Sequence, residues 1–284
     1  MSDPVIILAP PYSFTSVVSS MLGEHPKMYS LPEVHLFAAE TMRQRRTAWP
    51  NHGLLRVVAQ LFAGEQTVRT VAQAQTWVNA RADRSCVSVF QELAEKAMPK
   101  ALVEKSPSTT SSCEYLQRAW RAFPSARFIH LVRHPTAHVQ SVARRRSGTF
   151  DHRSDPQLLI ELWYTRHMNI VTFLGGVPEA QKMRIRGEDL LGAPDIHLRS
   201  IASWLGVDTG EEAIEAMKHP ERSPFACLGP RNARFGNSRG FLQAPSLRGS
   251  PAAGTSKSER SRRRPVATGG LSPEVRELAN ELGY

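Results

Sequence analysis

The sequence predicts an α/β protein in which a short, mainly parallel sheet is flanked by helices. Two observations carry this prediction: residues 5–9 are a continuous apolar run and residues 128–132 are apolar apart from His130, as is typical of buried parallel strands, and each run leads into a helical pattern. The chain has 284 residues, 41% of them apolar, which is enough for one large core. We therefore expect a single domain over residues 1–245, with insertions, rather than two domains.

The first strand leads into a loop that we interpret as a phosphate cradle. Its residues are Pro10, Pro11, Tyr12, Ser13, Phe14, Thr15 and Ser16. A strand that stops at two prolines, turns through hydroxyl residues and enters a helix presents backbone N–H groups and a positive helix end to an anion. This arrangement is P-loop-like.

Two other interpretations of this loop remain. In an ordinary strand-to-helix turn, Ser13 or Thr15 would merely cap the helix. A nucleoside triphosphatase loop requires G-x-x-x-x-G-K-[ST], and neither its glycines nor its lysine is present, so metal-assisted phosphoryl transfer is disfavoured.

The segment after the first helix is mainly helical. Residues 58–62, 68–78 and 87–97 carry apolar side chains at three- and four-residue spacing. We expect a helical insertion over about residues 38–98 that forms a lid.

The second apolar strand places a cation at its carboxyl end. Arg133 follows this strand directly, and ligands of open α/β sheets bind at that end of the strands. Pro135 suits the first turn of a helix, and Ser141 lies about two helical turns further on. A guanidinium and a hydroxyl so placed can converge on one phosphate. The alternative is a surface ion pair for Arg133 and a solvated Ser141.

The rest of the chain alternates between regular elements and a basic segment. We expect a helix over residues 155–174, a strand over 182–186 and helices over 196–205 and 271–284, the last one docking on the domain. Residues 246–270 are rich in Ser, Gly and Pro and carry six Lys or Arg between 248 and 264, which predicts a flexible linker or loop. Without interleaved aromatic residues, nucleic acid is not expected as the main ligand.

Several motifs together resemble the sulfotransferases that use 3′-phosphoadenosine 5′-phosphosulfate (PAPS). The first loop resembles the P-[RK]-S-G-T-T loop that holds the 5′-phosphosulfate, and Arg133 with Ser141 resembles the pair that holds the 3′-phosphate. VEKSP at 103–107 and RGEDL at 186–190 resemble the motifs K-[ST]-P and R-Y-E-D-L. Residues 32–42 are similar to P-E-L-H-L-x-x-x-E-T-M of bacterial members, including polyketide assembly-line domains that sulfate a carrier-bound β-hydroxyacyl chain.

The resemblance implies a reaction and a set of site residues. PAPS would donate a sulfuryl group to a small-molecule or carrier-protein-bound alcohol, with 3′-phosphoadenosine 5′-phosphate (PAP) as product and no metal. Glu33 would be the catalytic base, and Lys105 would lie near the sulfuryl group. A late loop, residues 229–245, would fold over the nucleotide and offer four candidate ligands, which are Arg231, Arg234, Asn237 and Arg239.

Three departures from the family pattern leave a second function open. Tyr12 replaces the usual Arg or Lys, Phe14 replaces a glycine, and Gly187 replaces an aromatic residue near the adenine. Trp163 or Phe235 are the candidates for a substitute aromatic contact. The alternative function is a catalytically weakened nucleotide-binding protein that acts as a binding or scaffold partner.

Three residues compete for the role of general base. We rank Glu33 first, His219 second and His35 third. The non-catalytic interpretation of Glu33 is a carboxylate at a helix N-terminus, since Pro32 and Glu33 look like a helix start. A lone histidine on a helix, as expected for His35, is more often structural.

Composition places further bounds on the protein. The formal net charge is +10, and the three cysteines are scattered without metal-ligand spacing, so reduced thiols are expected. No apolar run is long enough to cross a bilayer, and the first residues lack the pattern of a signal peptide. We therefore expect a cytoplasmic protein.

Overall fold

The computed structural model describes residues 3–145, 155–247 and 270–284, with side chains omitted for 143–145. Five strands of this described part form one sheet in the order β2-β3-β1-β4-β5. Their bounds are β1 (Val5–Leu8), β2 (Met28–Ser30), β3 (Ala101–Glu104), β4 (Arg127–Val132) and β5 (Lys182–Arg186). All four strand pairs are parallel, so the predicted α/β class is confirmed. The basic tract at 248–264 lies outside the described residues.

Alternate side chains of β1 enter two separate cores, because successive residues of a strand point to opposite faces of the sheet. Ile6 and Leu8 belong to one apolar cluster, and Val5 and Ile7 to another. This double burial explains why β1 is a continuous apolar run.

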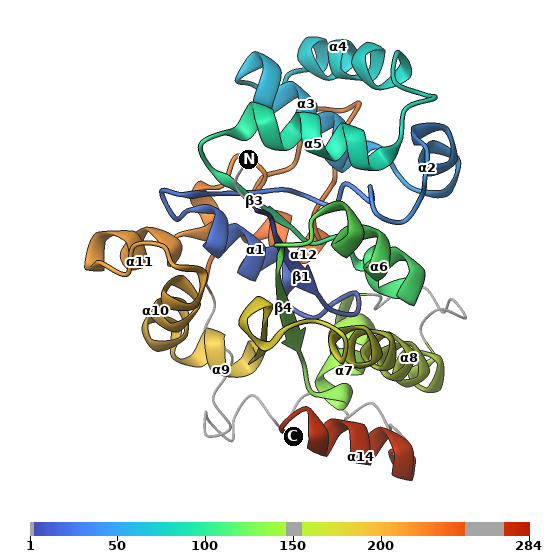
Figure 1. Ribbon diagram of the computed structural model, residues 1–284, viewed down its shortest axis with the longest axis vertical. Helices are drawn as coiled ribbons and strands as arrows, with labels where there is room; N and C mark the ends of the chain where they lie inside the picture. The colour runs from blue at the N-terminus through green and yellow to red at the C-terminus, as the bar shows by residue number, and fades with distance from the viewer. Residues whose placement is uncertain (1–2, 146–154, 248–269) are drawn as a thin grey trace.

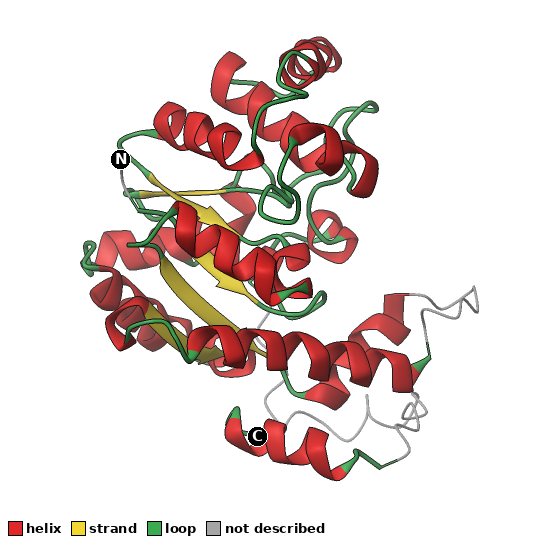
Figure 2. Cartoon of the chain, turned by 45° about the vertical axis from the view of Figure 1, so that its right-hand side comes forward, coloured by secondary structure: helices red, strands yellow, loops and turns green. Residues whose placement is uncertain are grey.

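Helices cover both faces of the sheet (Figure 1). On one side lie α1 (Thr15–Gly23), α9 (Gly187–Gly192), α10 (Pro194–Leu205) and α11 (Glu211–Met217). On the other side lie α6 (Cys113–Ala122) and α8 (Pro156–Leu174). Figure 2 shows the strands between these two helical layers. The described part of the chain also contains α7 (Pro135–Arg145), α12 (Arg239–Gln243) and short 3₁₀ turns at Pro107–Ser111, Glu179–Gln181 and Pro220–Arg222.

Four helices lie between β2 and β3 and cover one end of the molecule (Figure 1). They are α2 (Met42–Ala48), α3 (His52–Ala63), α4 (Val68–Asn79) and α5 (Cys86–Ala97). Thr41, Thr67 and Ser85 cap α2, α4 and α5, because each side chain accepts a hydrogen bond from a backbone N–H of the first turn. The periodic segments at 58–62, 68–78 and 87–97 are therefore helical, as predicted.

The segment that follows α1 differs from its prediction. Residues 24–32 contain β2, a strand that was not predicted and that pairs with β3 through Tyr29 and Leu102. Residues 31–36 form no helix, so the interpretations of Glu33 as a helix N-terminal carboxylate and of His35 as a helical residue are wrong. His35 instead adopts a left-handed backbone with φ of 54°. The reason is tertiary, since backbone groups of this segment bond to distant residues.

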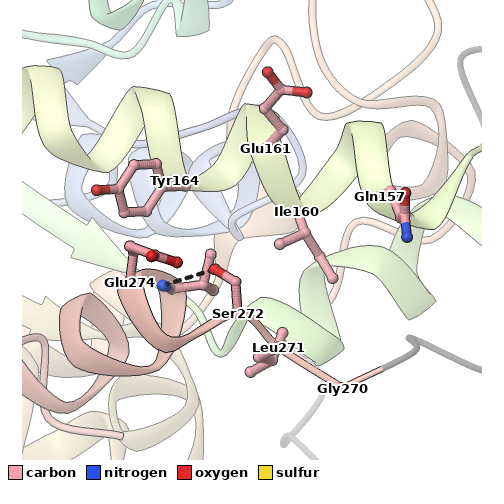
Figure 3. Close-up of a pocket in the computed structure, with 9 residues that line it drawn as sticks. Gln157, Ile160, Glu161, Tyr164, Gly270, Leu271, Ser272 and Glu274 are labelled. Atoms are coloured by element: carbon pink, nitrogen blue, oxygen red, sulfur yellow. Dashed lines mark hydrogen bonds between the residues drawn. The ribbon is translucent and has the colours of Figure 1, made fainter.

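The last helix, α14 (Pro273–Glu281), docks on α8 as predicted (Figure 2). Val275, Leu278 and Leu282 pack with Trp163 and Val132 in one apolar cluster. Figure 3 shows a pocket of about 330 Å³ between α8 and the start of α14. None of the residues predicted for the functional site lines this pocket.

Within residues 3–145, 155–247 and 270–284, no helix is long and apolar enough to cross a membrane.

Candidate functional site

The loop between β1 and α1 has an unusual backbone. Tyr12 and Phe14 both adopt positive φ angles, 67° and 62°, which L residues rarely do. Phe14 is the N-cap of α1, and no side chain caps this helix, so the interpretation of Ser13 or Thr15 as a simple cap is wrong. Ser13 is fully buried, and its Oγ has no hydrogen-bond partner among the described residues. An anion held by this loop would satisfy such a group.

An ion pair between a buried lysine and a partly exposed glutamate lies beside the loop. Lys105 follows β3, is 1% exposed, and its Nζ lies 3.1 Å from Oε1 of Glu33. The same Nζ donates a hydrogen bond of 3.3 Å to Oγ of Ser16 in the first turn of α1. The Glu33 side chain is 28% exposed, so it remains accessible to a substrate. The fold thus brings together a base candidate, a cation and the loop.

The backbone around Glu33 is fixed by three distant elements. Oγ of Ser106 accepts hydrogen bonds from the N–H groups of Val34 and His35, at 3.0 and 2.8 Å. Nε of Arg45, on α2, donates to the carbonyl of Val34 at 2.7 Å. The N–H of Glu33 donates to the carbonyl of Gly236 at 2.7 Å. A carboxylate on such a segment is held in place before any ligand arrives.

Two glycines allow this close packing around Glu33. A Cβ on Gly53 would lie 2.1 Å from the carbonyl oxygen of Glu33, and Gly236 approaches Gly53 with a φ of 129°. Side chains at these positions would push the Glu33 backbone away. Glycine is therefore required at both positions by space, and at Gly236 also by conformation.

His35 lies next to Glu33 but is poorly suited as a base. Its Nδ1 is 2.8 Å from Oγ of Ser108, its Nε2 is 3.9 Å from Oε2 of Glu33, and its ring stacks on Trp49. Burial, together with the nearby cations Arg45 and Lys105, lowers the pKa of His35 to about 3. A neutral imidazole of such low basicity orients its neighbours rather than accepting protons.

The carboxyl end of β3 carries a second buried acid. Glu104 is fully buried, and its Oε1 accepts a hydrogen bond of 2.7 Å from the N–H of Ser106. Burial raises the pKa of Glu104 to about 7, although the bond from Ser106 and the charge of Lys105 act in the opposite direction. Glu104 thus fixes Ser106, which in turn fixes the Glu33 segment.

The carboxyl end of β4 brings Arg133 to the other side of the loop. Arg133 is buried, and its Nη1 donates a hydrogen bond of 2.6 Å to the carbonyl of Tyr12. Its guanidinium carbon lies 4.0 Å from the centre of the Phe14 ring. Ser141 is also buried, on α7, which begins two residues after Arg133. The Tyr12 ring turns toward α7, where it meets His138 and an apolar cluster.

The late loop closes over the cradle through its backbone. The N–H of Ser238 donates to Oγ of Ser16 at 3.1 Å, the atom that also accepts from Lys105. Asn237 is buried, and its amide donates to the carbonyl of Phe225. The guanidinium of Arg239 lies over the ring of Phe235.

Some predicted residues lie elsewhere. Arg231 and Arg234 are exposed on the outer part of the late loop. His219 pairs with Glu215 and Glu221 and acts electrostatically on Glu24, which follows the C-terminal end of α1. The cradle lies at the opposite end of that helix, so His219 does not join the site. Trp163 is fully buried, and its Nε1 donates to the carbonyl of Arg133. It therefore holds the backbone at the end of β4 and presents no exposed ring to a nucleotide.

Comparison with known proteins decides the family. A model of the sulfotransferase family matches residues 4–211, which is well over half of the chain. The chain belongs to the sulfotransferase family. Sulfuryl transfer in general is therefore the chemistry of its family.

Solved structures show the same fold for this sulfotransferase. The sulfotransferase domain from the curacin biosynthetic pathway has 24% identity and a TM-score of 0.80, and the comparison covers 100% of this chain and 98% of that one. The sulfotransferase domain from the Synechococcus PCC 7002 olefin synthase has 27% identity and a TM-score of 0.77, over 100% and 96% of the two chains. Mouse sulfotransferase SULT7A1 complexed with PAP has 12% identity and a TM-score of 0.52, over 99% and 83%. No curated protein matches the sequence.

Sequence reasoning missed several residues that build the site of this sulfotransferase. Ser106, Ser238, Gly53 and Gly236 position the loop and the Glu33 segment through the contacts described above. Only Ser106 had a signal, since it is part of the K-[ST]-P motif. In the part of the chain that the structure describes, no group of three His, Cys, Asp or Glu side chains could hold a metal ion.

Proposed function

We propose that this sulfotransferase transfers the sulfuryl group of PAPS to the hydroxyl of an alcohol. The observation that carries the proposal is the Lys105–Glu33 pair beside the loop, in which Lys105 also donates a hydrogen bond to Ser16 of the loop. It supplies an accessible carboxylate and a buried cation at one place, and sulfuryl transfer needs both.

The residues present fit a nucleotide with two phosphate groups. Lys105 and Arg133 lie at the ends of two strands that flank β1, so a cation is available on either side of the loop. The Oγ of Ser13, which has no hydrogen-bond partner in the described part of the chain, and the hydroxyl of Ser16 lie in the loop itself. In this proposal the loop and Lys105 hold the 5′-phosphosulfate, and Arg133 with Ser141 holds the 3′-phosphate.

PAPS supplies the sulfuryl group, and the protein supplies a base, a cation and alignment. The carboxylate of Glu33 takes the proton of the acceptor hydroxyl while the new oxygen–sulfur bond forms and the bond from sulfur to the 5′-phosphate oxygen breaks. Lys105 stabilises the charge that develops on that phosphate oxygen. Because the Glu33 backbone is fixed by Ser106 and Gly236, little reorganisation is needed.

The acceptor class is proposed from the two similar domains. These domains belong to the curacin pathway and to an olefin synthase. We infer that the alcohol is a small molecule or a hydroxyacyl chain bound to a carrier protein.

A non-catalytic nucleotide-binding protein is the alternative raised by Tyr12. The Tyr12 ring packs toward α7, and the loop has no arginine or lysine at this position. The buried Lys105 beside the loop offers a substitute positive charge, which favours the enzyme.

Calorimetric titration with PAP tests the proposal without knowledge of the acceptor. We expect micromolar binding of PAP and much weaker binding of 5′-AMP, because only PAP carries the 3′-phosphate. Binding that does not depend on the 3′-phosphate, or no binding of either nucleotide, would contradict a PAPS site.

A further inference from the structure

Phe14 of the loop contacts two distant residues, Arg133 and Gly187. The Phe14 ring lies against the guanidinium of Arg133, with the carbon at 4.0 Å from the ring centre. The ring also reaches the start of α9, where a Cβ on Gly187 would lie 2.4 Å from Cδ2 of Phe14. The ring therefore fills space that exists only because residue 187 has no side chain.

The backbone at Gly187 is not free to move away from the ring. Its neighbour Glu188 accepts hydrogen bonds from the N–H of His134 and from the hydroxyl of Tyr284, at 3.1 and 2.7 Å. Its other neighbour, Arg186, stacks on the ring of Tyr284. A side chain at 187 would thus collide with Phe14 rather than push the strand end outward.

Phe14 occupies its place at a cost in backbone free energy. A φ of 62° is unfavourable for a residue with a Cβ, and glycine would avoid this strain. Strain of this kind persists where surrounding contacts compensate for it, and it is concentrated at functional sites. The compensating contacts here are those of the ring with Arg133 and with the space at Gly187.

We propose that Phe14 is a positioning residue that holds the Arg133 guanidinium by stacking, and that Gly187 is the partner that makes room for its ring. Together with the carbonyl of Tyr12, which accepts a hydrogen bond from Arg133, the ring fixes the plane of the guanidinium. The pair thereby sets the preference for a nucleotide with a 3′-phosphate. This inference rests on the proposed PAPS function.

The test compares PAP and 5′-AMP binding in a set of variants. Phe14→Leu keeps a side chain and the strained backbone but removes the aromatic face, and Phe14→Tyr keeps the face. Because the Phe14 ring is partly exposed, its stacking on the guanidinium is worth roughly a two- to fivefold change in affinity. We expect Phe14→Leu to weaken PAP binding by about that factor and to leave the affinity for 5′-AMP unchanged. Phe14→Tyr should bind both nucleotides like the wild type. Phe62→Leu is the matched control. Phe62 lies on α3, and its ring contacts Lys96 of α5, so its removal should change neither affinity.

A double-mutant cycle tests the role of Gly187. Gly187→Ala should lower both the PAP affinity and the melting temperature when Phe14 is present. In a Phe14→Gly background the same change should have little further effect, because the ring that it would strike is gone.

The outcomes separate this inference from the proposed function. If the wild type binds PAP in a 3′-phosphate-dependent way but Phe14→Leu keeps the wild-type ratio of PAP to 5′-AMP affinity, the positioning role is overturned and the function stands. Additive effects of Gly187→Ala and Phe14→Gly would overturn the pairing. If the wild type shows no 3′-phosphate-dependent binding, the proposed function fails and this inference fails with it.

Discussion

At the scale of single residues, the site is organised around one carboxylate and two cations. Glu33 contacts Lys105, and Arg133 contacts the loop from the opposite side. All three were predicted from motifs: Lys105 and Arg133 each follow a strand, and Glu33 belongs to the segment at 32–42 that resembles P-E-L-H-L-x-x-x-E-T-M. Their surroundings could not be predicted, because burial and distant partners decide which side chain can act as a base.

Replacing Glu33 by Gln should lower kcat by about 100-fold or more while PAP binding survives. The amide keeps the shape of the side chain but accepts no proton, and general base catalysis typically contributes factors of this size. The measurement is steady-state sulfuryl transfer together with PAP titration. Glu40→Gln is the matched control, since Glu40 is an exposed carboxylate of the same segment. An unchanged kcat for Glu33→Gln would remove it as the base.

Replacing Arg133 by Ala should weaken PAP binding by about 10- to 100-fold and leave 5′-AMP binding nearly unchanged. The expected loss corresponds to charge-assisted hydrogen bonds with the 3′-phosphate. Titration of both nucleotides measures it, and the KM for PAPS should rise far more than that for the acceptor. Arg43→Ala, at an exposed ion pair with Asp83, should change neither affinity. Equal losses for PAP and 5′-AMP would contradict the assignment.

At the scale of elements, the β3 end and the Glu33 segment form one hydrogen-bonded unit. Glu104 fixes the N–H of Ser106, and Oγ of Ser106 accepts from two N–H groups of the segment. The segment itself has no regular secondary structure between β2 and α2. The precision of the site therefore comes from side-chain bonds between elements rather than from a helix.

Removing this link with Ser106→Ala should lower kcat more than it lowers PAP affinity. The change leaves two buried N–H groups without an acceptor, at about 1–3 kcal/mol each, so the melting temperature should also fall by several degrees. Kinetics, PAP titration and thermal unfolding measure the three effects. Ser88→Ala on the exposed face of α5 is the matched control. A destabilised variant with unchanged kcat would show that Ser106 is structural only.

At the scale of the whole molecule, buried histidines link stability to pH. Nε2 of His130 lies 2.8 Å from Nδ1 of His167, and both rings are buried. His138 is buried near this pair, and His35 is buried in the site. Burial lowers the pKa of His35, His130 and His138 to about 3, and that of His167 well below its usual value. These rings stay neutral in the folded chain at neutral pH.

The melting temperature should therefore be several degrees lower at pH 5.5 than at pH 7.5. The unfolded chain takes up protons on these histidines below about pH 6.5 while the folded chain does not, so stability falls as the pH drops below that value. Glu104 acts in the opposite direction between about pH 4.5 and 7, because its raised pKa lets the folded state hold a proton first. Four histidines outweigh one glutamate. Thermal unfolding across this range measures the net effect, and equal melting temperatures at the two pH values would contradict it.

The sequence alone determined the order and type of the main elements and the family motifs. Apolar runs and helical periodicity are local patterns, and they predicted the strands at β1 and β4, the helices of the insertion and the terminal helix α14. The motifs also named Lys105 and Arg133, because a strand end fixes where the following residue lies in the sheet, and Glu33, because its segment resembles one that carries the family's catalytic base. The short edge strand β2 was missed because three residues carry too little periodic signal.

Only the tertiary structure decided how these residues are held and which of them share a site. It placed His219 at the far end of α1, buried Trp163 behind Arg133, and brought Gly53 and Gly236 against Glu33. It also paired Phe14 with Gly187, two departures from the family pattern that are more than 170 positions apart in the sequence. The physical reason is that excluded volume and burial depend on contacts between distant segments, which no local pattern records.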